Sequence, residues 1–292
     1  MKISVITINY NGLSDTRAFL ESFRKEIQGV EYEIIVVDNA SMNNEAKMLE
    51  DEFNGVICVR SDVNLGFSGG NNLGVKYSTG GLLLFINNDI IIKSNFIQPL
   101  LDKICQDTNI AAISPQIRYM DNTLCYGGCE PIDKYLLRIH YLNGSLEKGL
   151  SVSQEVPLMH GAAVIIKKDV LNKIGGWPEI YFLYSEEVDL SIHIRNLGFS
   201  IWYEPKSIVY HVGSQSTGKD SSLVCYYNTR NRLLLYKRNL HGLTRFISIL
   251  YQLLVINLCT SLKLILKGEI DLFKAICQGV IDFLCGNFYK KK

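Results

Sequence analysis

Short apolar runs alternate with amphipathic segments along the first hundred residues of the chain. Each run is rich in Val, Ile and Leu and ends at polar or glycine residues. The runs lie at residues 3–8, 33–37, 56–59 and 82–86. Runs of this kind, bounded by turn residues, are typical of buried parallel strands. Between them, helical spacing of apolar residues predicts helices over 14–27 and 43–53. This alternation predicts an α/β fold with a Rossmann-like, mostly parallel central sheet.

The pattern becomes less regular after residue 110. Apolar segments predict strands, some of them in mixed directions, at residues 111–114, 135–141, 162–167, 199–204 and 208–211. A helical period covers residues 187–197 and stops at Gly198. Residues 64–72 are rich in glycine and asparagine, which predicts a loop before a short helix that ends near Ser78. Residues 213–222 are the most linker-like stretch, and the composition changes after them.

The last seventy residues are apolar and basic. Residues 230–292 contain eleven Lys and Arg against three Asp and Glu, although the whole chain has a net charge of only +1. Residues 246–262 lack charge, which is at the lower length limit of a membrane-spanning helix, and charges interrupt a second apolar stretch at 270–289. Helices that lie in a membrane interface, held by basic residues, fit this pattern better than spanning helices. Helices that only cap the body are the other alternative.

Composition and length limit the domain organisation. With 292 residues, 47% of them hydrophobic and 20% charged, the chain can form a packed core and is not disordered. We expect a domain over 1–222, with a nucleotide-binding half (1–110) and an acceptor and catalytic half (111–222), followed by a helical tail (223–292). The net charge argues against nucleic acid as a partner.

The eight cysteines do not predict a disulfide framework, because several lie inside apolar runs of a chain that is too long to need one. Cys125 and Cys129 form a C-x3-C pair, but no second Cys or His pair lies nearby, so we expect no structural zinc. The apolar run after Lys2 is too short for a signal peptide, which predicts that the body lies in the cytoplasm.

Polar residues follow the predicted strands at the edge of the sheet where α/β proteins bind ligands. Asp38 ends the second strand. Its carboxylate could accept a hydrogen bond from N3–H of a pyrimidine, with Tyr10 as a flat partner for the base, or it could cap the next helix. The sequence does not fit a Rossmann dehydrogenase, because residues 9–12, after the first strand, lack the G-x-G-x-x-G pattern.

Two further polar segments could contact a nucleotide. The glycines of residues 64–72 would let backbone amides approach a phosphate or ribose, although the segment is not a P-loop and could be a tight turn that opens a helix. Asn87, Asn88 and Asp89 follow the fourth strand. One carboxylate with two amides could hold Mg²⁺ or Mn²⁺ against a diphosphate, and the alternative is an ordinary turn.

Three carboxylates, those of Glu186, Glu187 and Asp189, open the predicted helix that begins near residue 187. Their mutual repulsion tends to raise a pKa, and a general base for a sugar hydroxyl needs a carboxylate near the acceptor oxygen. The alternative is that acidic residues simply favour a helix N-terminus. His211 follows an apolar segment. A lone histidine is usually structural, but imidazole is an acceptable ligand for Mn²⁺ beside a diphosphate.

Together these segments resemble the family 2 glycosyltransferases of the GT-A fold, of the rhamnosyltransferase-like type that builds bacterial surface polysaccharides. The resemblance covers roughly residues 2–240. It rests on five motifs in the same order and on one histidine: residues 4–11, 36–41, 64–72, 87–89 and 175–190, and His211.

The resemblance implies a role for each matching residue. The nucleotide-base pocket would be formed by Ile8, Asn9, Tyr10 and Asp38. The ribose and diphosphate side would be lined by Asn64, Gly66, Phe67 and Asn71. Asp89 matches the last residue of the family's D-x-D-like metal motif, Asn88 would lie beside the ribose or the metal, and His211 would complete the metal shell. Glu187 matches the general base, with Glu186 as the alternative.

Two residues depart from the family pattern. Asn87 stands where many members have an acid, so we expect weaker binding of the cation, which would arrive with the donor. Glu187 replaces the usual Asp and is one methylene longer. The implied reaction is inverting transfer of a sugar, with rhamnose suggested by analogy, from a dTDP- or UDP-sugar to a saccharide or lipid-linked acceptor. A divalent cation, Mg²⁺ or Mn²⁺, would assist the departure of the nucleoside diphosphate. The enzyme would work at the inner face of the cell membrane.

Two other functions fit part of the sequence. A nucleotidyltransferase would need a basic, glycine-rich loop after the first strand, and residues 9–13 contain no Lys or Arg. A non-catalytic membrane scaffold that binds a nucleotide sugar is the other alternative. The presence of Asp89, Glu187 and His211 together argues against it.

Overall fold

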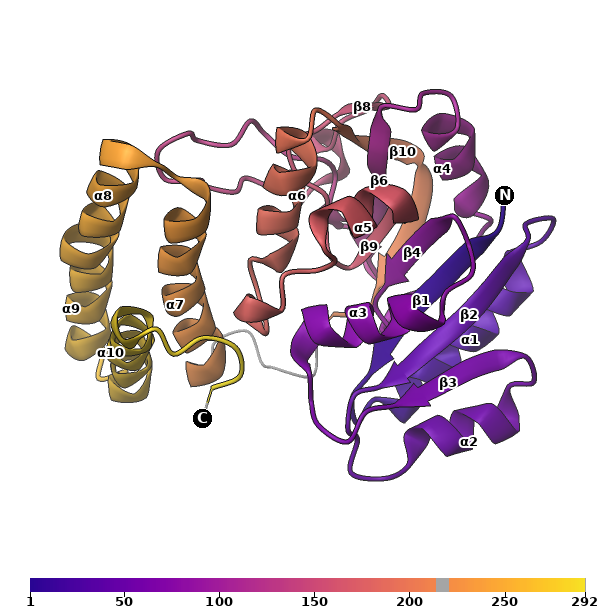
Figure 1. Cartoon of the computed structure of the whole chain (residues 1–292), viewed down its shortest axis with the longest axis horizontal. Coiled ribbons are helices and arrows are strands. Elements are labelled where there is room, and N and C mark those ends of the chain that lie inside the picture. The colour runs from indigo at the N-terminus through magenta and orange to yellow at the C-terminus, as the bar shows by residue number, and fades with distance from the viewer. Residues whose placement is uncertain (214–220, 292) are drawn as a thin grey trace.

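The computed structural model describes residues 1–213 and 221–291 as a mixed central sheet with helices on both of its faces, followed by a group of helices at one end (Figure 1). The strands are β1 (Ile3–Asn9), β2 (Tyr32–Asp38), β3 (Val56–Arg60), β4 (Leu82–Ile86), β5 (Ile90–Ile91), β6 (Ile110–Tyr119), β7 (Leu124–Tyr126), β8 (Gln154–Glu155), β9 (Ala163–Lys167) and β10 (Ser200–His211). The predicted linker at 213–222 lies mostly outside the described residues.

The helices alternate with the strands in the first half of the chain and then dominate its end. The α-helices are α1 (Leu13–Glu26), α2 (Glu45–Glu52), α3 (Gly66–Tyr77), α4 (Ile97–Ile104), α5 (Lys168–Ile174), α6 (Glu186–Asn196), α7 (Ser222–Asn239), α8 (Gly242–Tyr251), α9 (Leu258–Leu266) and α10 (Ile270–Cys285). Two short 3₁₀ helices, η1 (Leu146–Lys148) and η2 (Glu179–Tyr181), and the π-helix η3 (Gln252–Asn257) complete the list.

The strand order is β3-β2-β1-β4-β9-β6-β10-β5, with β7 beside β6 and β8 beside β10. The β3-β2-β1-β4 part is parallel, as the sequence predicts. β9 runs antiparallel to both β4 and β6. Asn9 pairs with Asp38, so the last residues of β1 and β2 are neighbours at the ligand-binding edge. The predicted α/β fold is confirmed.

The prediction of a loop over residues 64–72 is wrong, because α3 already begins at Gly66. Glycine is a poor helix former, but here it allows the helix to lie against β1. A Cβ atom at Gly70 would come within 2.9 Å of Ile8 Cδ1, and one at Gly74 within 2.5 Å of Ile6 Cγ2. Close packing therefore overrides local propensity in this segment.

The prediction of a strand over residues 135–141 is also wrong. These residues form an irregular segment with a single isolated bridge, between Tyr141 and Cys129. Asp133 Oδ1 accepts hydrogen bonds from the N–H groups of Tyr135 and Leu136, and Leu137 has a φ of 46°. These side-chain contacts fold the segment into a turn in place of a strand. The two strands predicted at 199–204 and 208–211 are one strand, β10, with an irregularity between Glu204 and Ile208.

The C-terminal residues are helical, as predicted. α8, η3 and α9 form one continuous helix over Gly242–Leu266, which lies at the edge of the molecule farthest from β1–β3 in Figure 1. α7 lies between this helix and α6. Leu233, Leu235 and Tyr236 of α7 belong to the same hydrophobic core as the sheet. The first helix of the predicted tail is therefore packed as part of the body.

Candidate active site

A turn with unusual backbone geometry precedes the predicted catalytic carboxylates at the start of α6. Phe182, Tyr184 and Ser185 all have positive φ angles, of 67°, 68° and 77°. Such angles are unfavourable for residues with a Cβ atom, so the surrounding structure must stabilise them. We call residues 181–185 the catalytic turn.

Two consecutive residues of α7 hold the catalytic turn from one side. Asn231 Nδ2 donates to the carbonyl oxygens of Tyr181, Leu183 and Tyr184 at 3.2, 2.7 and 2.9 Å. Arg230 Nη2 donates to the same Tyr181 oxygen at 2.7 Å. Both side chains are fully buried. These bonds fix the backbone that aims Glu186 and Glu187.

α3 holds the same turn from the other side. The backbone N–H of Phe67 donates to the Phe182 carbonyl oxygen at 2.9 Å. Gly66 has a φ of 72°, and a Cβ atom there would lie 2.2 Å from that oxygen, so the contact requires glycine. The predicted donor-binding residues Gly66 and Phe67 therefore touch the segment that positions the predicted base.

The two glutamates at the start of α6 differ in environment. Glu186 is buried, and its burial together with the charge of Glu187 raises its pKa to about 8. Glu187 remains partly exposed. Burial raises the pKa of Glu187 as well, but His160, Tyr141 and Arg232 oppose the rise, and the Tyr141 hydroxyl donates to its Oε1 at 3.4 Å. Glu187 is thus the more exposed of the two glutamates, and a general base must be within reach of the acceptor.

The two predicted metal ligands meet at the ends of their strands. His211 Nε2 at the end of β10 lies 3.1 Å from Asp89 Oδ1, which follows β4. Burial would lower the pKa of His211, but hydrogen bonding to Asp89 and Cys125 raises it to about 9. Burial raises the pKa of Asp15, and the charge of Asp89 raises it further.

This pair fits a hard divalent cation. Two adjacent ligands of an octahedral ion, with bonds of about 2.1 Å, lie about 3 Å apart. Over residues 1–213 and 221–291, no group of three or more His, Cys, Asp and Glu side chains could hold a metal ion. A cation held by Asp89 and His211 would therefore take its remaining ligands from phosphate oxygens and water.

Three side chains that the sequence did not single out as catalytic interact with His211 or with Glu187. Burial opposes ionisation of the Cys125 thiol, but hydrogen bonds from His160 and His211 lower its pKa to about 5. The His160 ring lies 5.1 Å from that of Tyr141, which bonds to Glu187. His160 and Tyr141 lie in irregular segments, and no local pattern marked them. Cys125 was visible only as half of the C-x3-C pair.

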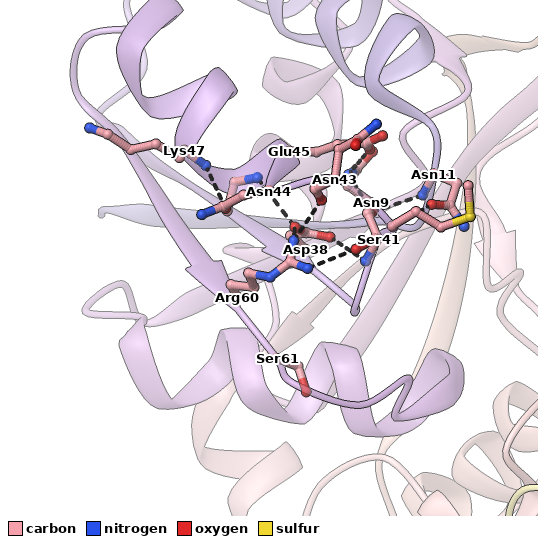
Figure 2. Close-up of polar contacts among 12 residues, drawn as sticks. Asn9, Asn11, Asp38, Ser41, Asn43, Asn44, Glu45, Lys47, Arg60 and Ser61 are labelled. Carbon is pink, nitrogen blue, oxygen red and sulfur yellow. Dashed lines mark hydrogen bonds and ion pairs between the residues drawn. The ribbon is translucent and has the colours of Figure 1, made fainter.

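Two residues of the predicted base pocket, Asp38 and Asn9, form hydrogen bonds within the protein (Figure 2). Asp38 is fully buried. Its carboxylate accepts from the N–H of Ser41 at 2.9 Å and of Ala46 at 3.3 Å, and it forms an ion pair with Arg60. Because Ala46 lies in the first turn of α2, Asp38 also satisfies an N–H group at the start of the next helix, which was its alternative role. A contact between Asp38 and a base stays a prediction, for which Arg60 is the partly exposed partner.

Asn9 is also fully buried. Its Nδ2 donates to Glu45 Oε2 at 2.7 Å (Figure 2). Its Oδ1 accepts from Thr16 Oγ1 at 2.8 Å, so its side chain joins α1 to α2. Tyr10 is different, because 47% of its surface is exposed at the strand end. Ile8 packs against α3 beside Gly70. Of the four predicted base-pocket residues, Tyr10 is the one most open to a ligand.

The asparagines near α3 build its first turn. Asn64 Oδ1 accepts from the N–H of Gly66 at 2.9 Å and from Asn39 Nδ2 at 3.2 Å. Asn71 is buried, and its Nδ2 has no hydrogen-bond partner among the described residues. Asn88 Nδ2 donates to Thr16 Oγ1 at 2.9 Å, so Asn88 faces α1 while Asp89 faces His211.

The sequence matches a model of the family described as Glycosyl transferase family 2 over residues 4–175. That match covers more than half of the chain, and the chain therefore belongs to this family. It is a glycosyltransferase with a GT-A fold. Glu187 and His211 lie beyond the matched residues, so their placement comes from the structure.

Two relatives whose names specify a sugar transfer are similar to this chain. The low-salt glycan biosynthesis hexosyltransferase Agl10 of Haloferax volcanii is 28% identical over 237 residues, which are 80% of this chain and 74% of that protein. The N-acetylglucosaminyl-diphospho-decaprenol L-rhamnosyltransferase of Mycobacterium tuberculosis is 22% identical over 241 residues, which are 75% of this chain and 78% of that protein.

Among solved structures, GalNAc-T7 with UDP, GalNAc and Mn²⁺ has a similar fold. The TM-score is 0.65 at 19% sequence identity, and the match covers 79% of this chain. This chain spans about half the length of that neighbour, with 47% covered. The likeness supports the predicted GT-A architecture.

Substitution by glutamine should affect activity at one of the two glutamates and not at the other. Glu187→Gln removes the accessible base, and we expect kcat to fall by about 10²- to 10⁴-fold, the usual range for general base catalysis. Glu186→Gln should retain most of the activity, because a carboxyl with a pKa of about 8 is already uncharged at pH 7. Turnover of a nucleotide sugar by the two variants measures this. Equal losses in the two variants would exclude this assignment of the base, and full activity of Glu187→Gln would exclude Glu187 as the base.

The raised pKa of Glu186 also predicts a pH-dependent stability. The folded state holds this proton more tightly than the unfolded chain, whose value is near 4.5, so the stabilisation present at low pH is lost as the pH rises towards 8. The melting temperature of Glu186→Gln should therefore exceed that of the wild type by a margin that grows between pH 5 and pH 8. Glu147→Gln, at an exposed position, should show a constant margin.

Asn231 should affect catalysis through the catalytic turn. Asn231→Asp keeps the shape of the side chain but removes the amide donor, so we expect kcat to fall at least tenfold and stability to fall by about 1–3 kcal/mol, the cost of leaving buried polar groups unpaired. Asn228→Ala, at an exposed position of the same helix, is the control. Measurement of kcat well below each melting temperature separates the two effects. An unchanged kcat in folded Asn231→Asp protein would contradict this role.

Proposed function

We propose that this chain is an inverting glycosyltransferase that moves a sugar from a UDP- or dTDP-sugar to a hydroxyl group of a saccharide or lipid-linked saccharide, in the synthesis of a cell-surface polysaccharide. The observation that best supports this proposal is that the partly exposed Glu187, with the Tyr141 hydroxyl beside it, opens α6, while Asp89 and His211 meet at the ends of β4 and β10. One base and one cation site on a common edge are what displacement at an anomeric carbon requires.

In the proposed mechanism, Glu187 accepts the proton of the acceptor hydroxyl group. The acceptor oxygen then forms a bond to the anomeric carbon while the bond from that carbon to the diphosphate oxygen breaks on the opposite face. The Tyr141 hydroxyl, 3.4 Å from Glu187 Oε1, keeps the carboxylate oriented. A divalent cation, when bound, supplies positive charge that stabilises the leaving nucleoside diphosphate. Asp89 and His211 are the residues that would hold it.

The donor would bind along the ends of β1, β2 and β4. We propose that the exposed ring of Tyr10 stacks on the base and that the Asp38–Arg60 pair faces its edge. The UDP in the GalNAc-T7 structure supports a pyrimidine nucleotide. The mycobacterial relative, whose name specifies L-rhamnose and a diphospho-decaprenol acceptor, supports rhamnose as a donor sugar and a lipid-linked acceptor.

We also propose that the chain works as a peripheral protein at the inner face of the cell membrane. One helix, Gly242–Leu266, is long and apolar enough to cross a membrane, which is weak evidence by itself, and only 17% of its most apolar window is buried in the protein. The surplus of basic residues after residue 230 would favour an anionic surface. In this arrangement α7 belongs to the body, and the membrane-facing part begins at α8.

Nucleotide binding tests the donor and cation parts of the proposal. We expect Mn²⁺ together with UDP or dTDP to raise the melting temperature, and Mn²⁺ alone to have a smaller effect, because two protein ligands hold the ion weakly without a diphosphate. His211→Ala should abolish the Mn²⁺-dependent part of the shift. His241→Ala, at an exposed histidine before α8, should leave it unchanged.

Three results would count against this proposal. A larger stabilisation by GDP or CDP than by UDP and dTDP would exclude a UDP- or dTDP-sugar as the donor. The same nucleotide shift with and without Mn²⁺ would exclude the cation site. An absence of any shift in folded protein would favour a degenerate donor site and the scaffold alternative.

A further inference from the structure

An apolar groove separates the irregular segment at residues 133–138 from α8. The groove has a volume of about 460 Å³ and is lined by Tyr135 and Leu136 on one side and by Leu243, Ile247 and Tyr251 on the other. No charged residue is among the described residues that line it. Leu243 is 72% exposed and Ile247 is 54% exposed. Clustered apolar side chains that remain open to this extent indicate a surface that binds an apolar partner.

The helix that forms one wall of the groove has its polarity reversed relative to a soluble surface helix. Its polar residues Ser248, Gln252, Asn257 and Ser261 are buried. Its exposed positions are mainly apolar, among them Phe246, Leu254, Leu258 and Leu262. A helix in water buries its apolar face, so this arrangement suits a lipid environment. The groove is continuous with the apolar face, and a chain bound in it would extend towards the same environment.

Positive charge lies between the groove and the candidate base. Arg232 Nη1 donates to the Leu137 carbonyl oxygen at 2.9 Å, directly after the groove residue Leu136. The charge of Arg232 also acts on Glu187. Arg138 is exposed on the same segment, and both arginines act on Tyr236, whose hydroxyl donates to Gln252 on η3 at 3.3 Å. Arg232 therefore lies between the groove and Glu187, and Arg138 lies beside the groove on the same segment as Leu136.

We propose that this groove binds the hydrocarbon chain of a lipid-linked acceptor, with Arg138 and Arg232 facing the phosphates that join the chain to its saccharide. The proposal rests on the proposed glycosyltransferase function and names the substrate class of the same site. An acceptor of this kind has three parts in sequence, a hydrocarbon chain, an anionic linker and a sugar hydroxyl group. The groove, the two arginines and Glu187 are arranged in the same sequence, and guanidinium groups suit phosphate oxygens.

The acidic neighbour of the arginines does not remove this complementarity. Asp133 lies on the same segment, and its charge interacts with that of Arg138. Its Oδ1 accepts the N–H groups of Tyr135 and Leu136, and among the described residues it forms no ion pair with either arginine. Ser248 Oγ, the polar atom at the groove floor, donates to the Tyr135 carbonyl oxygen at 2.6 Å and is buried. The groove therefore presents apolar surface, and the cations beside it remain available for an anion.

Binding of a soluble isoprenoid diphosphate tests the proposal. Farnesyl diphosphate contains a hydrocarbon chain and two phosphates, and inorganic diphosphate contains the phosphates alone. Titration calorimetry on the full chain, in EDTA so that the cation site plays no part, should show at least tenfold tighter binding of farnesyl diphosphate. Ile247→Trp, which fills the groove, should weaken that binding at least fivefold, and Leu243→Gln should weaken it in the same direction.

Two further variants complete the design. Leu254→Trp places the same ring on an exposed position of the same helix outside the groove and should leave the affinity unchanged. Arg138→Gln should weaken binding of farnesyl diphosphate by a similar factor to Ile247→Trp without affecting binding of farnesol. Circular dichroism confirms that each variant is folded, and Leu243→Gln, at the most exposed groove residue, keeps the test valid if Ile247→Trp is unstable.

Three results would overturn the proposal. Equal weakening by Ile247→Trp and Leu254→Trp would indicate general adsorption to the helix. Unchanged binding in both groove variants would place the chain elsewhere. A dimer in sedimentation that Ile247→Trp dissociates would identify a second copy as the occupant. The assay needs neither donor nor turnover, so its failure is distinct from failure of the glycosyltransferase proposal, which the Glu187→Gln comparison tests.

Discussion

The hydrogen bonds from Arg230 and Asn231 to the catalytic turn are the interaction on which the rest of the site depends. Three residues of that turn have positive φ angles, each at a cost of about 1–3 kcal/mol. The carbonyl oxygens of Tyr181, Leu183 and Tyr184 accept hydrogen bonds from α7. A strained turn of this kind persists only where its polar groups are paired. Because Arg230 also donates to the Tyr289 carbonyl oxygen at 2.7 Å, the same contact ties the end of the chain to the catalytic residues.

The three neighbouring carboxylates of Glu186, Glu187 and Asp189 differ in charge state and exposure. Their partners, Arg238 of α7 and Tyr141, explain part of this difference. Asp189 is fully buried but paired, because Arg238 Nη2 donates to its Oδ2 at 2.9 Å, so it is a structural anion. Glu186 is buried without such a cation and is held as the neutral acid. Glu187 alone stays accessible, with Tyr141 beside it. The residue pattern placed all three together, and only the family resemblance favoured Glu187, since the differences among them come from residues some fifty positions away.

Local patterns predicted the parallel half of the sheet and its ligand-binding edge, because strand runs and the turns after them are contiguous in sequence. They failed where distant contacts decide the structure. The glycines after Gly66 suggest a loop, yet packing on β1 makes the segment helical. The roles of Asp89, His211 and Glu187 were implied only by the family resemblance, and Cys125 and His160, which interact with His211 and Glu187, belong to segments that no periodicity relates. Asp38 likewise has an internal partner, Arg60, that a single sequence does not reveal.

The polarity of the helix Gly242–Leu266 limits how it could meet a membrane. Its polar face is already bonded to the body, with Ser248 donating to the Tyr135 carbonyl oxygen and Gln252 accepting from the Tyr236 hydroxyl. A helix that crossed a bilayer alone would have to break these bonds and expose the same groups to hydrocarbon, which is unfavourable. A helix that stays on the body offers only its opposite, apolar face to lipid. We therefore infer that contact along the surface is favoured over crossing, because it keeps α7, and with it the catalytic turn, in place.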